Sequence, residues 1–378
     1  MSMEIVQALL QGQRGRRLLW EFAVAGEAQL VPDYSGRQLS VGMFYASYQA
    51  EAARGEGVVM FGPGAEEAKN TFVSAQELAG LLERAELVPV TAELMHYALH
   101  ISVDAARYWQ EADGTDTVLA SDELKAPLER IAKHVQESGQ VDQWFDAVIL
   151  HEQHHVKFEI TDPVDPIEDT ARTGIKSLLA WKEHVILTEV RDTRDNRSRA
   201  LGTCSGEWWS SPNFYLEPTC GQFASGEPVG LSCVEDAFSW EKATTTLVDI
   251  PTSANVLEIS SAEQWVQLCK DHPIEVTAQK RHDWYHVTGR DGAWLMPDWL
   301  AVARRYDGVH LSIGAYLALA GHCLTVDAKF ATLIAGWDPG KTYWFIDTVA
   351  DRGYSQTWKF IDADSEEQRW VRAENSLG

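Results

Sequence analysis

Residues 151–155 of this chain read His-Glu-Gln-His-His, which contains the pattern H-E-x-x-H. On a helix, His151 and His155 would lie one turn apart on the same face, where two imidazoles can share a zinc ion. Glu152, between them, could then polarise a zinc-bound water. The pattern therefore offers a metal site with hydrolytic chemistry. The alternative is a polar helix end, with both histidines facing solvent or hydrogen-bonded to the backbone.

The segment before this pattern resembles zinc metallopeptidases, because Ala147-Val148-Ile149-Leu150 matches their apolar lead-in. In the branch of that family in which a glutamate completes the zinc site, the glutamate comes from a following helix. The resemblance implies that Glu168 or Glu183 would be the third ligand. His154 departs from the family, in which this interior position is usually apolar.

A second group of chemically active side chains lies within residues 280–347. Arg281 and His282 carry local positive charge in an acidic protein. Cations beside tryptophans suit an anionic, ring-bearing ligand, through charge-assisted hydrogen bonds and stacking. Five tryptophans lie in the same stretch: Trp284, Trp294, Trp299, Trp337 and Trp344.

The same stretch contains candidates for proton transfer. His286 and His310 could each act as an acid or a base near neutral pH, and Tyr306 precedes the second of them by one short turn. The alternative interpretation is structural. The tryptophans would then form the core of the domain, and Arg304 and Arg305 would form a solvated helix end.

Residues 200–350 resemble a loosely defined set of uncharacterised bacterial proteins. The order of their motifs is similar to that of small ADP-ribosyltransferase-like folds. The matching motifs are Gly202-Thr203, Pro228-Val229-Gly230-Leu231, Val256-Leu257-Glu258-Ile259, Pro297-Asp298-Trp299, Tyr306-Asp307-Gly308-Val309 and Gly336-Trp337-Asp338.

This resemblance implies a cleft between two small sheets that binds NAD or another nucleotide. Arg199 would stand for the first-strand arginine, and Ser210 and Ser211 for the serine segment. On the late strand, His310 stands where the family has its catalytic acid. A degenerate nucleotide site, or different chemistry, is therefore implied equally.

Residues 1–162 are predicted to form a mostly helical domain. Ser74 and Thr91 precede apolar residues at helical spacing and are predicted N-caps, and a third helix is expected to start at Ser121. A fourth helix is expected to begin after Asp142 and to carry the histidines of residues 151–155.

Two segments of this domain are expected to be strands. Residues 18–25 and 38–48 are rich in aromatic and β-branched residues, which favour extended structure.

Two prolines within residues 162–166 predict a linker. Residues 163–195 are accordingly interpreted as a linker and a connecting helix, and the polar run 191–199 as a loop. Residues 196–378 contain eleven of the 15 tryptophans and are predicted to form an α+β domain with a candidate ligand pocket.

Two local signals are expected to position the second group of side chains. Ser261 is a predicted N-cap, and residues 289–292 a predicted hairpin turn. The predicted fold class is α+β, a mostly helical N-terminal domain followed by a small-sheet C-terminal domain.

Composition limits the possible partners. Lys and Arg number 32 against 56 Asp and Glu, a formal charge of −24, which repels phosphate backbones and anionic lipids. Nucleic acid and membrane partners are therefore not expected. The 5 cysteines contain no C-x-x-C pair and the N-terminus has no basic, apolar leader, so a cytoplasmic protein is expected.

Three functions remain open from the sequence. The first is an ADP-ribosyltransferase-like protein that binds a small anionic or nucleotide ligand such as NAD. The second is a zinc-dependent hydrolase that uses residues 151–155. The third is a non-enzymatic module whose tryptophan-rich face binds a protein partner, since interfaces are enriched in aromatic residues.

Overall fold

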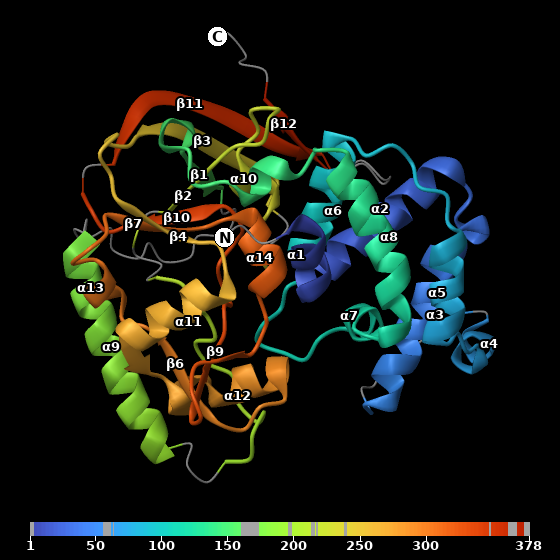
Figure 1. Cartoon of the computed structure of the whole chain (residues 1–378), viewed down its shortest axis with the longest axis horizontal. Coiled ribbons are helices and arrows are strands. Elements are labelled where there is room, and N and C mark those ends of the chain that lie inside the picture. The colour runs from blue at the N-terminus through green and yellow to red at the C-terminus, as the bar shows by residue number, and fades with distance from the viewer. Residues whose placement is uncertain are drawn as a thin grey trace.

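A computed structural model describes residues 4–55, 62, 64–159, 174–195, 199–212, 216, 218–237, 240–347, 349–361 and 369–373. Helices gather on one side of the molecule and strands with further helices on the other (Figure 1). The α+β class expected from the sequence is confirmed. Within the described residues, no helix is both long and apolar enough to cross a membrane.

The helical side is built from the first part of the chain. Its α-helices are α1 (Ile5–Gln11), α2 (Gln13–Leu30), α3 (Gln38–Ala53), α4 (Ala65–Asn70), α5 (Ala75–Arg84), α6 (Ala92–Asp104), α7 (Gly114–Leu119) and α8 (Lys125–Glu137). Short 3₁₀ turns follow or join them: η1 (Tyr34–Gly36), η2 (Asp122–Leu124), η3 (Asp142–Phe145) and η4 (Leu150–Glu152).

An eight-stranded sheet forms the upper layer of the other side in Figure 1. Its order is β12 (Arg369–Arg372), β11 (Ala350–Ile361), β3 (Lys242–Asp249), β1 (His154–Phe158), β2 (Pro218–Cys220), β10 (Lys341–Trp344), β7 (Gly308–Leu311) and β4 (Val256–Ile259). Among the described strands of this sheet, only β4 and β7 pair in parallel. Because β1 lies between β3 and β2, this sheet takes one strand from before residue 162.

A four-stranded sheet with helices completes that side. Its order is β5 (Pro273–Glu275), β6 (Ala293–Pro297), β9 (Phe330–Thr332) and β8 (Leu324–Thr325). The helices are α9 (Gly174–Asp195), α10 (Val229–Ser232), α11 (Ala262–Asp271), α12 (Thr277–Thr288), α13 (Trp299–Val302) and α14 (Ile313–Leu319).

Local helix signals were predicted correctly. The Ser74 side chain accepts a hydrogen bond from the Glu77 N–H, and Glu77 returns one, which completes a capping box. Thr91 and Ser261 also cap the predicted helices. In the third helix, every residue of the predicted apolar stripe is buried: Leu124, Leu128, Ile131, Ala132 and Val135.

The two strands predicted near the N-terminus are wrong. Residues 18–25 lie within α2 and residues 38–48 within α3. In α2 the buried side chains Leu18, Leu19 and Phe22 recur at helical spacing. Tertiary packing of that stripe overrides the extended preference of its aromatic residues.

Two later boundaries also differ from the prediction. The expected hairpin at residues 289–292 is absent, because α12 continues to Thr288 and ends at Gly289 in the left-handed conformation, with φ 67°. The polar run predicted as a loop belongs to α9 as far as Asp195.

The tryptophans of residues 280–347 form core. Trp284, Trp294, Trp299 and Trp337 are all 0% exposed and Trp344 is 3% exposed. The rings of Trp299 and Trp337 lie edge to face, with centroids 5.7 Å apart. The proposed tryptophan-rich binding face is therefore wrong for these five residues, because they are not available to a partner.

Close backbone packing joins the helical side to the sheets. At Gly12, between α1 and α2, an added Cβ would lie 1.8 Å from the carbonyl oxygen of Leu317 on α14. One apolar core runs through both sides without interruption.

Buried charged groups lie on both sides of this interface. Arg14 on α2 is paired with Asp116 on α7 and donates to the carbonyl oxygen of Ser102 on α6 at 2.6 Å. On the sheet side, Glu235 is 8% exposed, and its backbone N–H donates to the Asp338 carboxylate at 2.9 Å. Burial, and then the charge of Asp338, raise the pKa of Glu235 to about 8.

We expect Gly12→Ala to lower the free energy of unfolding by about 3 kcal/mol, because the new methyl group meets backbone that cannot move aside locally. Gly80→Ala is the matched control. Its nearest neighbour is the end of the flexible Arg84 side chain at 3.2 Å, so it should be neutral or stabilise the helix by up to about 1 kcal/mol. Urea unfolding compares the two variants, and equal denaturation midpoints would contradict the close backbone contact at Gly12.

Glu235 predicts a pH dependence of stability. Its folded-state pKa of about 8 lies above the ordinary 4.5, so the folded protein keeps a proton that the unfolded chain releases. Stability should fall as pH rises from about 4.5 to about 8. Glu235→Gln should remove this decline and be more stable than the wild type by about 2–4 kcal/mol at pH 8, with little difference at pH 4. If the unfolding free energies of the wild type and Glu235→Gln run parallel across this pH range, the raised pKa of Glu235 is refuted.

Candidate functional site

The H-E-x-x-H segment does not form the predicted helix. The chain makes two short 3₁₀ turns, η3 and η4, and then enters β1 in the middle of the large sheet. His151 therefore lies on a turn and His155 on a strand, where side chains one helical turn apart in sequence do not share a face. The prediction failed because pairing of β1 with β3 outweighs local helix preference.

The contacts of these side chains also differ from those of a metal site. His155 Nδ1 lies 3.1 Å from the Asp351 carboxylate, and His154 Nε2 lies 2.9 Å from the Gln222 side-chain oxygen. The side chain of His151 is 77% exposed. Over the described ranges, no group of three or more His, Cys, Asp or Glu side chains could hold a metal.

The remaining proposed ligands do not complete that site. Glu183 lies on an exposed face of α9, and Glu168 falls outside the described residues. Glu152 has only a 3.7 Å approach to His151. The structure therefore does not support zinc hydrolysis at residues 151–155.

Three ionisable residues of α12 hold the segment 199–211 in place. The Asp283 carboxylate accepts from the Ser205 hydroxyl at 2.6 Å and from the Gly206 N–H at 3.0 Å. Lys280, buried, donates to the carbonyl oxygen of Glu207 at 2.5 Å, and burial lowers its pKa to about 8. His286 Nε2 donates to the Gly202 carbonyl oxygen at 2.9 Å.

The predicted serine segment belongs to the same structural arrangement. Ser210 is 0% exposed and Ser211 3% exposed. The Ser210 hydroxyl accepts from the Ala335 N–H at 3.1 Å, and its carbonyl oxygen accepts from the Trp299 indole at 3.2 Å. These side chains position backbone and do not face a ligand.

The predicted arginine and histidine ligands do not meet either. Arg199 is exposed and lies 3.5 Å from the sulfur of Cys204. Arg281 lines a separate groove of about 390 Å³, together with Glu189 and Asp291. His282 is 3% exposed, and no described group hydrogen-bonds to either of its ring nitrogens.

His310 lies on β7, within the large sheet and away from these residues. Its Nδ1 is 2.7 Å from the Glu258 carboxylate, whose residue is directly opposite on β4. Thr342 is its opposite neighbour on β10. A carboxylate therefore lies beside His310 on the neighbouring strand, and among the described residues no hydrogen bond or ion pair joins either group to His286.

Tyr306, the third proposed catalytic residue, is partly buried against the main core. The proposed catalytic set of His310, Tyr306 and His286 is therefore distributed over different elements with different partners.

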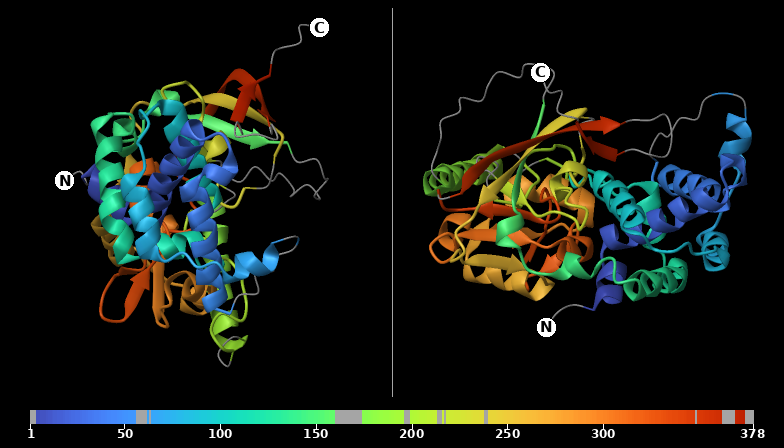
Figure 2. Two further views of the ribbon diagram at one scale, coloured as in Figure 1. Left: turned by 90° about the vertical axis from the view of Figure 1, so that its right-hand side faces the viewer. Right: turned by 90° about the horizontal axis from the view of Figure 1, so that it is seen from above.

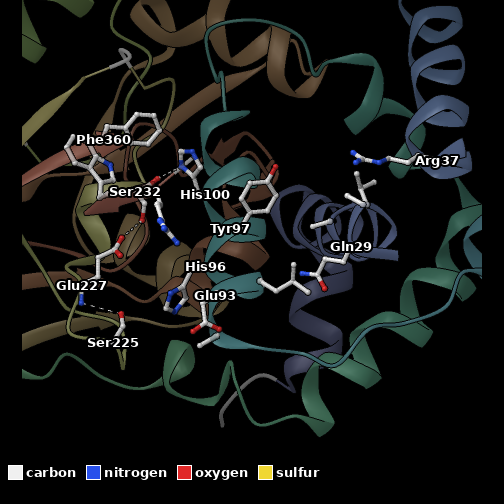
Figure 3. Close-up of a pocket in the computed structure, with 17 residues that line it drawn as sticks. Gln29, Arg37, Glu93, His96, Tyr97, His100, Ser225, Glu227, Ser232 and Phe360 are labelled. Atoms are coloured by element: carbon white, nitrogen blue, oxygen red, sulfur yellow. Dashed lines mark hydrogen bonds between the residues drawn. The ribbon is translucent and has the colours of Figure 1, made fainter. Parts of the chain in front are cut away.

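A cavity of about 600 Å³ lies elsewhere, between the helical side and the edge of the large sheet (Figure 3). α2 and α6 form one wall, and α10, β11 and β12 form the other. Its volume is within the 300–1,000 Å³ usual for small-molecule sites. The apolar lining residues are Val24, Ala25, Ala28, Ala92, Leu94, Phe360 and Trp370.

Polar side chains gather where α6 approaches α10. His100 Nδ1 donates to the carbonyl oxygen of Ser232 at 2.5 Å. In a neutral imidazole this bond leaves Nε2 as the acceptor. The Ser232 hydroxyl donates to Glu227 at 3.4 Å, and burial raises the pKa of that carboxyl.

His96 lies one turn before His100 on α6. Its ring stacks on Phe223, with centroids 3.7 Å apart. Burial lowers the pKa of His96 to about 4, against a smaller effect of Glu93. This imidazole is therefore neutral at physiological pH and presents a hydrogen-bonding group without charge.

This arrangement suits binding and proton exchange more than nucleophilic catalysis. The Ser232 hydroxyl bonds to the Glu227 carboxyl and not to the imidazole of His100, so the serine–histidine pair of a nucleophilic hydroxyl is not formed here. These residues were not among those expected from the sequence. The sequence does contain one indication of them. Glu93, His96, Tyr97 and His100 recur at helical spacing on one face of a helix whose other face is apolar and whose N-cap is Thr91.

We expect Asp283→Ala to destabilise the protein by about 2–3 kcal/mol, because it leaves the Ser205 hydroxyl and the Gly206 N–H without their acceptor. Cleavage within residues 199–211 by a low concentration of protease should become faster. Asp291→Ala, on the groove beyond α12, is the control and should change neither measurement. Wild-type cleavage rates in Asp283→Ala would contradict the role given to this carboxylate.

Comparisons with known proteins do not assign this chain to a family. No protein-family model, curated protein or solved structure matches the chain. The interpretation of the cavity consequently depends on its own residues.

Proposed function

We propose that this protein binds a small organic ligand with a planar ring in the cavity between α2, α6 and the edge of the large sheet. The observation that carries the proposal is the cavity itself, about 600 Å³ with a mostly apolar lining and a few convergent polar groups. Such a site retains a ligand through apolar burial and orients it through hydrogen bonds.

The sheet wall supplies the apolar and aromatic contacts. Phe360 and Trp370 lie next to one another, with ring centroids 5.4 Å apart. A planar ligand can pack against such rings at a gain of about 0.5–1.5 kcal/mol beyond the area buried. The helix wall opposite offers small side chains, Ala25 and Ala28, which leave room for it.

The polar groups define what the rest of the ligand must carry. His100 Nε2 is an acceptor, and Glu227 can donate when protonated. Arg37 and Glu227 lie on opposite sides of the cavity in Figure 3. The lining holds Arg37 and Arg369 against Glu93 and Glu227, so its formal charges balance. A neutral ligand, or one with opposite charges at its two ends, fits this balance.

NAD and ADP-ribose remain the first candidates named from the sequence, and Arg37 and Arg369 would have to bind the negative phosphates that they bring to this balanced lining. They carry planar rings, and the motif order of residues 200–350 suggests them. The residues that would contact them are those of the cavity and not Arg199, Ser210 or Ser211, which have other partners. The same cavity is also compatible with a non-enzymatic binding protein.

The cavity predicts saturable binding of the ring-bearing probe 1-anilinonaphthalene-8-sulfonate to the folded chain. We expect Ala28→Phe, which fills the cavity, to weaken this binding at least about tenfold, since a lost apolar contact of that size corresponds to 1.4 kcal/mol or more. Ala126→Phe, on the exposed face of α8, is the matched control and should bind as the wild type does.

Fluorescence titration at constant protein concentration measures both variants. Equal affinity for Ala28→Phe and Ala126→Phe would remove the cavity from consideration. Displacement of the probe by NAD or ADP-ribose would assign the nucleotide class, and failure of both to displace it at millimolar concentration would exclude that class.

A further inference from the structure

α9 carries more exposed large apolar side chains than any other described helix. Ile175, Leu179, Ile186 and Val190 are 43%, 52%, 46% and 66% exposed. Leu187, beside them, is 62% exposed. α9 runs along the outer edge of the molecule in both Figure 1 and the right-hand view of Figure 2. A monomeric protein rarely leaves such a stripe in water.

The inner face of α9 is already occupied. Leu178, Trp181 and Val185 are buried against the rest of the protein. Glu189 accepts the N–H groups of Ala278 and Gln279 at 2.8 and 3.1 Å. The helix is therefore held firmly by one face, and the apolar stripe is not a sign of an unpacked element.

The spacing of the stripe is the same in both directions along the helix. Ile175, Leu179, Ile186 and Val190 follow one another at intervals of 4, 7 and 4 positions. The midpoint of this series lies between Lys182 and Glu183. Under a two-fold axis through that midpoint, Ile175 would face Val190 of a second copy, and Leu179 would face its Ile186. An isologous interface requires this kind of self-complementarity.

The charges of the Lys, Arg, Asp and Glu residues along α9 balance, and Lys182, beside the midpoint, pairs with Asp298 of its own copy at 2.5 Å. Over the whole of α9 four basic residues balance four acidic ones, namely Lys176, Lys182, Arg191 and Arg194 against Glu183, Glu189, Asp192 and Asp195. Two α9 helices can thus approach although the chain carries a formal charge of −24.

We infer that two copies of this chain associate through antiparallel packing of their α9 helices, with the two-fold axis at residues 182 and 183. A single helix pair buries less area than the roughly 1,200–2,000 Å² of a stable interface. The dimer should therefore dissociate in the micromolar range, and dimer and monomer exchange with protein concentration.

Sedimentation velocity of the full chain between about 1 and 100 µM tests the association. The wild type should move from monomer to dimer over this range. Leu179→Glu should raise the dissociation constant at least tenfold, while Phe44→Glu, at an exposed phenylalanine on α3, should leave it unchanged. A chain that stays monomeric at 100 µM, or a dimer that Phe44→Glu weakens and Leu179→Glu does not, would overturn the inference.

Cysteine cross-linking tests the antiparallel arrangement independently of folding. In a background in which the two cysteines that are not buried, Cys204 and Cys323, are replaced by serine, Glu183→Cys lies at the axis and should form a dimer disulfide on mild oxidation. Leu179→Cys alone should not, because the two copies of residue 179 would lie about 10 Å apart along the axis.

A mixture of the Leu179→Cys and Ile186→Cys proteins provides the decisive comparison. These two positions face each other in the antiparallel dimer, so the mixture should cross-link where neither protein does alone. Cross-linking of Leu179→Cys alone would indicate parallel helices and refute the arrangement. Absence of cross-linking in both the mixture and Glu183→Cys would refute the contact.

Discussion

The buried ion pair between Arg14 and Asp116 constrains the rest of the molecule. A guanidinium that is 1% exposed must find its acceptors within the protein, and here they come from α6 and α7. Removing one partner of such a pair costs about 3–5 kcal/mol, because it leaves a buried charge uncompensated. The positions of α2, α6 and α7 are thus fixed together, two residues after the Gly12 contact fixes α2 against α14. Since α2 and α6 form one wall of the cavity, this pair also sets the shape of the proposed binding site.

Features that depend on neighbouring residues could be predicted from the sequence. The Ser74 capping box and the caps at Thr91 and Ser261 are local hydrogen-bonding arrangements, and the structure has each of them. The start of α12 could not be predicted in this way. Its N-cap residue, Val276, has no side-chain acceptor, and Glu189 on α9 supplies one from 89 residues away. Sequence reasoning fails at this helix because its cap is a tertiary contact.

The candidate site was missed for the same reason. The cavity joins residues of α2, α6, α10, β11 and β12, and no short stretch of sequence contains two of its walls. The stretch 280–347, in contrast, attracted attention because its polar residues are dense. Lys280, Asp283 and His286 are dense there because they hold 13 residues of irregular backbone, 199–211, which has no strand partners of its own. Density of ionisable groups indicated a structural requirement and not a ligand.

α9 has apolar side chains on its outer face as well as on its buried face. A helix on a monomer turns its apolar stripe inward and its charges to water. On α9, Lys182 and Glu189 make ion-pair and hydrogen-bond contacts with α12 and the residue before α13, while Ile186 and Val190 point to solvent. Asp298, the partner of Lys182, is itself the N-cap of α13. The outward stripe is thus attached to the helix that also organises α12 and the segment 199–211. A second copy bound there would rest on one of the most firmly connected elements of this side of the protein, and the cavity on the helical side would stay open to its ligand.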